Sequence, residues 1–198
     1  MTLQLGVFAQ KQEYSAPNLK TVIKTHKIVA ILPFKVAISY KKMPKNLDAQ
    51  SIKDEEVRES VSMQEGMYTY LLRKAKSFSV EFQDVEQTNR LLKKSNVYDK
   101  IEELPMDTLC KVLGVDAIIR SSWNYEKTGS EVGAIAKTLL FGFGSSASGN
   151  LLMQIYDAKK GDLLWRFYKE MSESAFSTGN ELMERMMKKV ARNFPYEK

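Results

Sequence analysis

Apolar positions along the chain follow two patterns, which predict buried strands and amphipathic helices. Residues 27–38 and 115–119 are nearly continuous apolar runs rich in β-branched side chains, which is typical of inner strands covered on both faces. Pro33 interrupts the first run and lacks a backbone N–H, so we expect it at a bulge or where the strand leaves the sheet. Residues 78–82 alternate between apolar and polar positions, which predicts a half-buried strand.

Apolar residues at three-to-four-residue spacing predict helices between these strands. Residues 54–76 have this spacing over a length of about six turns. The other three helices are expected after the capping-box residue Asp84, from Pro105 to the C-terminal cap Gly114, and from the cap Thr178 to the residue before Pro195. The methionines of the last helix are expected to fill the core, although methionine-rich faces also suit adaptable interfaces.

The order of these elements predicts one α/β domain over residues 27–195. Strand–helix–strand connections imply parallel neighbours, whereas residues 150–157 and 162–170 predict an antiparallel hairpin that turns at Gly161. We therefore expect a mixed, mostly five-stranded sheet flanked by helices, with the hairpin and a final helix at the C-terminus. The 198 residues suit a single domain, and 43% hydrophobic with 27% charged residues argues against disorder.

The first residues suggest export. Residues 1–10 carry no charge and end in Val7-Phe8-Ala9, the small-residue pattern of a signal-peptidase site, so we interpret them as a signal peptide without its start and expect cleavage after Ala9. An ordinary frayed N-terminus is the alternative. Residues 11–26 are polar and are expected to form a basic arm before the fold. We therefore predict a periplasmic or outer-membrane-associated location.

The net charge of +6 lies near the N-terminus. Residues 11–50 contain eight lysines and two acidic residues, whereas the rest of the chain is balanced. Lysine is a hydrated point charge without the planar fork of arginine, so we expect no nucleic-acid partner. A solvated arm, an anionic membrane surface or an acidic partner fits better. Within this stretch we select Lys41, Lys42 and Lys45 as candidate contact residues.

One apolar segment is not needed for the core. Residues 128–149 combine five glycines with large apolar side chains between two strands, which would be unfavourable if they faced water. A buried helix, a subunit contact and a membrane-inserting hairpin are all open. The candidate interaction residues in this segment are Ile135, Leu139, Leu140, Phe141 and Phe143.

Candidate chemistry is sparse. One histidine (His26) and one cysteine (Cys110) exclude the usual zinc sites, and Cys110 lies in an apolar helix where its thiol is expected to be inert. The stretch Gly142–Ala147 matches a dinucleotide fingerprint, but a strand-like segment follows where a helix should open. We expect no catalytic residues, no metal and no cofactor.

Two sets of carboxylates remain. Asp54, Glu55, Glu56 and Glu59 are expected in the first turns of a helix, where they offset its dipole. Asp116 interrupts an apolar strand and is expected to be a structural polar anchor that accepts hydrogen bonds from a neighbouring loop. The alternative is a ligand-binding role near Asp116 and Trp123.

Three segments together resemble a group of cell-envelope proteins. Residues 28–34 (IVAILPF), 113–119 (LGVDAII) and 153–165 (MQIYDAKKGDLLW) are similar to the periplasmic domain of the curli secretion channel CsgG, the PelC lipoproteins and the amino-terminal domain of TolB. The resemblance covers about residues 27–194 and implies an anticodon-binding-domain-like fold without catalytic residues. Residues 128–149 differ from the two long hairpins of the CsgG barrel, so the resemblance does not imply a pore.

These observations predict a non-enzymatic, exported cell-envelope protein. We expect an interaction or assembly module, in outer-membrane secretion or envelope maintenance, that binds an envelope protein or a second copy of itself. The alternative is a periplasmic module that binds a small or polymeric ligand.

Overall fold

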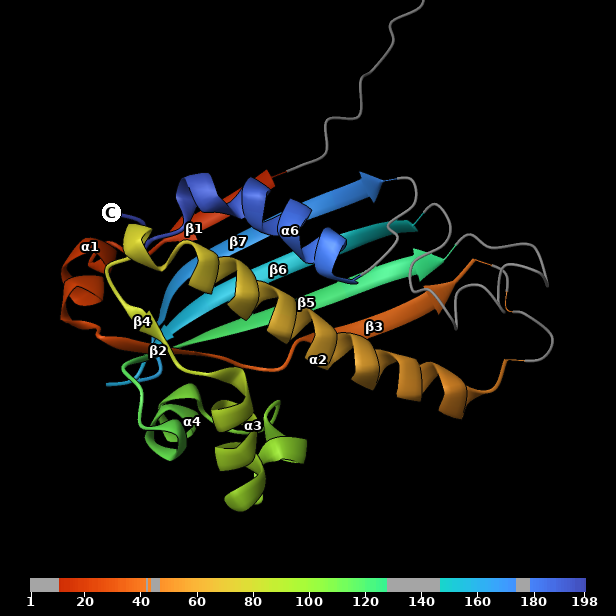
Figure 1. The fold of residues 1–198 in the computed structure, drawn as a ribbon, viewed down its shortest axis with the longest axis horizontal. Helices are drawn as coiled ribbons and strands as arrows, with labels where there is room; N and C mark the ends of the chain where they lie inside the picture. Colours follow the sequence, from red (N-terminus) through yellow and green to blue (C-terminus); the bar gives the residue numbers. More distant parts are fainter. Residues whose placement is uncertain (1–10, 42, 44–46, 128–146, 174–178) are drawn as a thin grey trace, which may run out of the picture.

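Seven strands form one mixed sheet in the computed structural model, which describes residues 11–41, 43, 47–127, 147–173 and 179–198 (Figure 1). The order is β1-β7-β6-β5-β2-β4, and β3 also pairs with β5. The strands are β1 (Lys11–Ser15), β2 (Ile28–Ile31), β3 (Lys35–Tyr40), β4 (Glu81–Phe82), β5 (Ala117–Lys127), β6 (Ala147–Asp157) and β7 (Leu163–Glu173). The mixed α/β single-domain prediction is confirmed, with seven strands where mostly five were expected.

Helices connect these strands. They are α1 (Leu19–Val22), α2 (Ala49–Arg73), α3 (Val85–Lys94), α4 (Met106–Leu113) and α6 (Gly179–Val190), with short 3-10 turns η1 (Ile23–Thr25), η2 (Ala75–Ser77), η3 (Tyr98–Lys100) and η4 (Ala191–Asn193). In Figure 1, α2 and α6 lie along one face of the sheet, whereas α3 and α4 lie beyond its β2 and β4 side. The sheet is therefore covered unequally.

The first apolar run forms two strands because Pro33 interrupts it. β2 pairs in parallel with β5 as far as Ile31 and Ile119, and β3 rejoins β5 at Lys35 and Ser122. Residues 32–34, between β2 and β3, thus lie opposite two residues of β5, 120 and 121. This is the irregularity expected around a proline, which has no N–H to donate. The bulge was predicted; the continuation of the run as a separate strand was not.

Residues 11–26 belong to the fold and do not form an arm. β1 pairs antiparallel with β7, from Lys11 opposite Lys169 to Ser15 opposite Trp165. The indole Nε1 of Trp165 donates to Glu13 at 3.2 Å, which attaches this polar strand to a buried residue. The polar composition that suggested an arm is that of a sheet edge, where charged side chains face water and discourage pairing with other chains.

Local signals place several element ends correctly. The Asp84 carboxylate accepts from the Gln87 N–H at 2.9 Å, as the capping prediction requires. Gly114 ends α4 with φ +67° and Gly161 turns the hairpin with φ +70°, both in the left-handed region that favours glycine. Pro105 is the N-cap of α4, one residue before its predicted place inside the helix.

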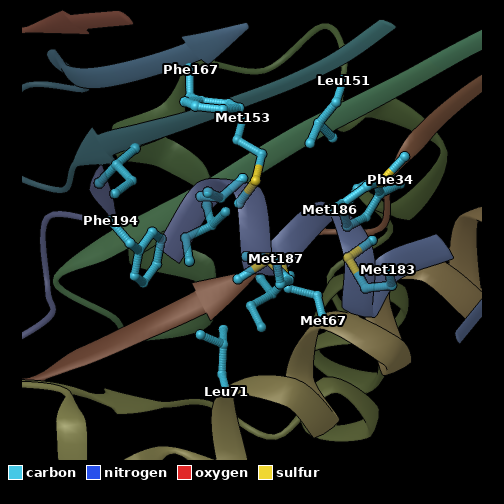
Figure 2. Close-up of a cluster of buried hydrophobic side chains, with 14 of the residues drawn as sticks. Phe34, Met67, Leu71, Leu151, Met153, Phe167, Met183, Met186, Met187 and Phe194 are labelled. Atoms are coloured by element: carbon cyan, nitrogen blue, oxygen red, sulfur yellow. The ribbon is translucent and has the colours of Figure 1, made fainter. Parts of the chain in front are cut away.

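The main core lies between the sheet and the helices α2 and α6. Figure 2 shows methionines of α6 packed against Met67 and Leu71 of α2 and against Met153 and Phe167 of the sheet. Met183, Met186 and Met187 are each at most 1% exposed. Because methionine has an unbranched, flexible side chain, it fills the irregular space between two helices and a twisted sheet. The core-filling interpretation of these methionines is confirmed.

A smaller core lies on the opposite side of the sheet. Ala30, Leu32 and Ile118 point there and pack against buried residues of α3 and α4, among them Leu92 and Leu109. These two helices leave most of β5, β6 and β7 on this side without a covering helix among the described residues. This uncovered area is the first candidate for function.

Candidate functional site

The sheet has two chemically different ends. At one end the registers align Tyr40, Lys127, Ala147 and Glu173 across four strands, and we call it the insertion end because residues 128–146 connect Lys127 to Ala147. At the other end, Ala117 of β5 pairs with Asp157 of β6, close to the C-terminal residues; we call it the terminal end. Each end holds a buried polar cluster.

Lys127 is the centre of the cluster at the insertion end. Its ammonium pairs with the Glu55 carboxylate, and only 10% and 14% of the two side chains are exposed. The ammonium also lies 5.4 Å from the ring centroid of Tyr40 and 5.8 Å from that of Tyr125. Lys127 therefore exchanges its hydration for one carboxylate and two aromatic faces.

A second carboxylate in this cluster is poorly compensated. Burial and, after it, the Glu55 charge raise the pKa of Glu59, and the Lys127 and Arg58 charges oppose them; the result is a pKa of about 7. The Oε2 atom of Glu59 is buried without a hydrogen-bond partner among the described residues. Burial, followed by the Glu55 charge, also raises the pKa of Tyr40 and Tyr125. Glu59 is thus the group in this cluster whose pKa lies near neutral pH.

The acidic run of α2 does not cap the helix, which corrects the sequence-based prediction. α2 begins at Ala49, and Asp48 is its N-cap, with the Asp48 carboxylate accepting from the Ser51 N–H at 2.6 Å. The predicted capping residues therefore lie inside the helix and have other partners. Glu56 accepts from the Ile38 N–H at 2.9 Å and so satisfies a backbone group of β3. The hydropathy pattern missed the polar first turn of α2, so the prediction started the helix too late.

The uncovered side of the sheet is a continuous polar and aromatic surface. Its side chains alternate with the buried ones along each strand and are exposed or half-buried. We call this surface the open face and define it by these residues: Gln12, Tyr14, Arg120, Ser122, Asn124, Asn150, Leu152, Gln154, Arg166 and Tyr168. No sequence-based prediction selected it, although the alternation of residues 119–127 is a signal that could have.

The open face has an unusual distribution of charge. Arg166 lies with its guanidinium carbon 6.0 Å from the ring centroid of Tyr168, and the register places it opposite Tyr14. At the edge of the surface, Glu102 accepts from Arg120 at 2.8 Å and from Lys35 at 2.9 Å. The centre of the open face thus carries amides, tyrosines and one arginine. Three carboxylates lie around it: Glu102 at the edge, and Glu126 and Glu170 toward the insertion end, where Glu170 accepts from the Tyr168 hydroxyl at 3.3 Å.

The terminal end holds a buried histidine that sequence reasoning passed over. The His26 Nδ1 lies 2.7 Å from the Tyr196 hydroxyl, and its Nε2 lies 3.0 Å from Asp157 Oδ1. The other oxygen of Asp157 accepts from the Lys159 N–H at 3.0 Å. The side chains of His26, Asp157 and Tyr196 are all buried. Their hydrogen bonds join the segment before β2, the β6–β7 turn and the C-terminus. This network has the residue types of a catalytic relay but no access for a substrate.

Asp116 and Cys110 lie near this end with defined partners. The Asp116 carboxylate accepts from the backbone N–H groups of Lys27 at 2.7 Å and Ile28 at 3.0 Å. These bonds outweigh the effect of burial and lower its pKa. Burial, with the Asp157 charge as the next cause, raises the pKa of the Cys110 thiol to about 12. Trp123 is 2% exposed beneath the helices and far along β5 from Asp116, so the two do not form one ligand site.

Most of the predicted interaction residues lie outside the described residues. These are Ile135, Leu139, Leu140, Phe141, Phe143, Lys42 and Lys45, as well as Gly142–Ser146 of the fingerprint-like stretch. Lys41 is described and exposed, and its N–H donates to the Lys127 carbonyl at 3.0 Å. The structure thus places Lys41 directly beside the point where the segment 128–146 leaves the sheet.

Two general properties can be stated for the described part of the chain. It contains no group of three or more His, Cys, Asp or Glu side chains arranged to hold a metal ion. Among the described helices, none combines the length and the apolar character that crossing a bilayer requires.

Comparisons with known proteins give a fold likeness. No protein-family model matches the chain. No curated protein matches it either. The lipoprotein GNA1162 from Neisseria meningitidis superposes with a TM-score of 0.52 at 12% identity, over 84% of this chain and 96% of that one. The PelC dodecamer from Paraburkholderia phytofirmans matches 96% of this chain and 98% of that one, with TM-score 0.46 and 10% identity.

A third solved structure has a similar relationship to the chain. The C-terminal domain of LpoB from Salmonella enterica covers 79% of this chain and 94% of its own length, with TM-score 0.39 and 11% identity. The resemblance to the CsgG and TolB domains remains a prediction. At 12% identity, the likeness to the lipoprotein GNA1162 concerns the fold alone.

Proposed function

We propose that this protein is a non-enzymatic, exported module of the cell envelope that binds a protein partner through the open face. The observation that carries this proposal is the composition of that face. Tyrosine and arginine are enriched at the energetic centres of protein interfaces, whereas lysine and acidic residues are depleted there. Tyr14, Arg166 and Tyr168 lie on neighbouring strands with amide side chains around them, and the charged pair Arg120–Glu102 lies at the rim.

The two sides of the sheet make this interpretation specific. The helices α2 and α6 lie over one side of the sheet, where residues such as Trp123 and Ile155 are buried. The other side offers an area with Leu152 at its centre, flanked in register by Ser122 and Tyr168. An apolar residue surrounded by hydrogen-bonding groups suits a wet, protein-binding surface. The fold likeness to a bacterial lipoprotein, GNA1162, supports the location that we propose.

Photo-crosslinking tests this proposal. A photoreactive amino acid replaces Tyr168 on the open face, and in a matched control it replaces Lys94, an exposed residue of α3. In bacterial cells that export the protein, we expect a discrete crosslinked species from position 168 and none from position 94. The double variant Arg166→Ala/Leu152→Ser is expected to abolish binding of that species. Equal crosslinking from both positions would refute a partner on the open face.

Self-association is the specific partner that we propose for the insertion end. Residues 128–149, with Ile135, Leu139, Leu140, Phe141 and Phe143, are the apolar contact in this proposal. Lys41, whose N–H donates to the Lys127 carbonyl, lies at the start of this segment, and we include Lys42 and Lys45, which follow Lys41 in the sequence, as contact residues. The register favours a clean test, because Lys127 pairs directly with Ala147 and a two-residue Asn-Gly turn can replace residues 128–146. We expect this variant to fold and to form smaller assemblies, with fewer chains per particle, by light scattering. A folded variant of unchanged mass would eliminate this contact.

A further inference from the structure

The end of α2 has a stretch of consecutive exposed residues that the fold does not explain. Residues 72–77 are all exposed, and they include Arg73, Lys74 and Lys76. Cations at a helix C-terminus offset the helix dipole, and one or two of them suffice for that effect. The remaining question is what lies beside them.

The C-terminal segment brings a second set of cations to the same surface. Lys198 donates from its backbone to the Ser77 carbonyl at 2.9 Å and from Nζ to the Lys76 carbonyl at 3.3 Å. Glu184 of α6 pairs with Arg73 at 3.4 Å and with Lys188 at 3.2 Å. These contacts bring Arg73, Lys76, Lys188 and Lys198 together. With the adjoining exposed residues Leu72 and Lys74 at the end of α2, we call this region the basic corner.

The charge of this region is large. Residues 73–76 and 184–198 together carry eight basic and two acidic residues, a net charge of +6. The sequence beyond residue 50 is neutral as a whole, so this excess is hidden by acidic residues elsewhere. The fold gathers these basic residues, because the ends of α2 and α6 and the C-terminus lie side by side (Figure 1). The candidate basic residues predicted from the sequence lie instead in the lysine-rich stretch at residues 11–50.

An exposed apolar residue accompanies these charges. Leu72 is 50% exposed and directly precedes Arg73. The long side chains of lysine and arginine extend charged groups from an apolar stem, and such residues beside an exposed leucine match the interface between lipid headgroups and acyl chains.

We propose that the basic corner docks on the surface of a bilayer that contains anionic phospholipids. Each lysine or arginine close to such a surface contributes to the attraction within about a Debye length, and Leu72 inserts at the headgroup level. This surface lies on the helix side and at the C-terminus, away from the open face. The proposal therefore does not depend on the partner-binding function proposed above.

Vesicle flotation with the whole chain tests the proposal. The probes are vesicles of phosphatidylglycerol and phosphatidylcholine in equal parts and vesicles of phosphatidylcholine alone. We expect the protein to bind the first kind and not the second, and binding to weaken as salt rises. The variant Lys74→Glu/Lys76→Glu is expected to bind roughly thirtyfold more weakly, since each basic contact contributes about tenfold or less.

Matched controls separate a local effect from a change in net charge. Lys94→Glu/Lys100→Glu reverses two exposed lysines near α3, with the same change in net charge. We expect this variant to bind within about twofold of the wild type. Leu72→Ser is expected to weaken binding several-fold at every salt concentration, because it removes an apolar contact. Urea unfolding of every variant verifies that it is folded.

Three results would overturn the proposal. The first is a wild-type chain that does not float with phosphatidylglycerol vesicles. The second is an equal loss of binding in the two double variants, which would make the effect one of net charge. The third is tighter binding to a poly-glutamate peptide than to the vesicles, which would assign the basic corner to an acidic protein.

Discussion

The two buried polar clusters lie at opposite ends of the β5–β6 ladder and differ in how well they are satisfied. At the terminal end, His26, Asp157 and Tyr196 are linked by hydrogen bonds of 2.7 and 3.0 Å. At the insertion end, one ammonium, that of Lys127, faces Glu55 and Glu59. The side chains of the first cluster are hydrogen-bonded to one another, whereas the second cluster has two carboxyl groups for one ammonium.

This difference teaches what each cluster does for the protein. A satisfied buried network holds distant segments in one arrangement, and removing any member leaves the others without partners. An incompletely compensated cluster lowers stability locally and responds to pH. The insertion end also lies beside Lys41 and the segment proposed for self-association, so the less stable cluster is at the place where a partner would act.

The largest expected effect is at the terminal end. Asp157→Ala removes the acceptor for both the His26 ring and the Lys159 N–H, and we expect it to lower the free energy of unfolding by about 4 kcal/mol. Urea unfolding followed by the fluorescence of the two buried tryptophans measures this. Asp162→Ala, at an exposed position in the same turn, should change it by no more than about 0.5 kcal/mol. A loss below about 1 kcal/mol in Asp157→Ala would show that this network is not a structural joint.

The next effect concerns the ion pair at the insertion end. Lys127→Ala leaves two carboxylates buried without their cation, and we expect a loss of about 3 kcal/mol. Lys127→Met/Glu55→Gln replaces the pair with neutral groups of similar size, so its stability should return to within about 1 kcal/mol of the wild type. If the double variant is as unstable as Lys127→Ala, the packing of the lysine stem, and not the charge, matters here.

We expect the titration of Glu59 to make the free energy of unfolding vary with pH. Its pKa is raised from 4.5 in the unfolded chain to about 7 in the folded chain, so the folded chain holds the proton more tightly. The contribution of Glu59 to stability is therefore fully present below about pH 4.5 and is lost as the pH rises through about 7, a loss of about 3 kcal/mol. Glu59→Gln should remove this slope, and Glu65→Gln, at an exposed position of α2, should keep it. An unchanged slope in Glu59→Gln would assign the titration to another group.

The smallest effect lies between the two ends. Ser121 is 2% exposed, and its hydroxyl has no hydrogen-bond partner among the described residues. Ser121→Ala should raise the free energy of unfolding by about 1 kcal/mol, because an unpaired buried hydroxyl is removed. Its neighbour Ser122 points to the open face, and Ser122→Ala should be neutral within about 0.5 kcal/mol. A loss of stability in Ser121→Ala would mean that the hydroxyl has a partner, such as a buried water.

Local signals predicted much of the fold. The caps Asp84 and Gly114, the turn at Gly161 and the interruption at Pro33 each depend on a few neighbouring residues, and the structure has them close to their predicted places. β1 was missed because an edge strand has no apolar pattern to detect. The second half of β5 was missed because its residues alternate, whereas the prediction relied on the continuous run before them.

The polar clusters were not predictable in the same way. His26 and Tyr196 are 170 positions apart, and His26 and Asp157 are 131 apart, so no spacing along the chain relates them. Lys127 and Glu55 are separated by 72 positions. Each residue by itself resembles an ordinary surface residue. The open face and the basic corner were missed for the same reason, since each gathers residues from several elements.

By itself, the sequence determined the class of fold, the boundaries of most helices and the identity of the core methionines. These follow from hydropathy period, caps and turns, which act over a few residues. Only the tertiary structure decided which side of the sheet is uncovered, that the one histidine is buried and where the positive charge accumulates. Those properties depend on strand order and helix placement, which bring together residues whose separation in the chain carries no signal.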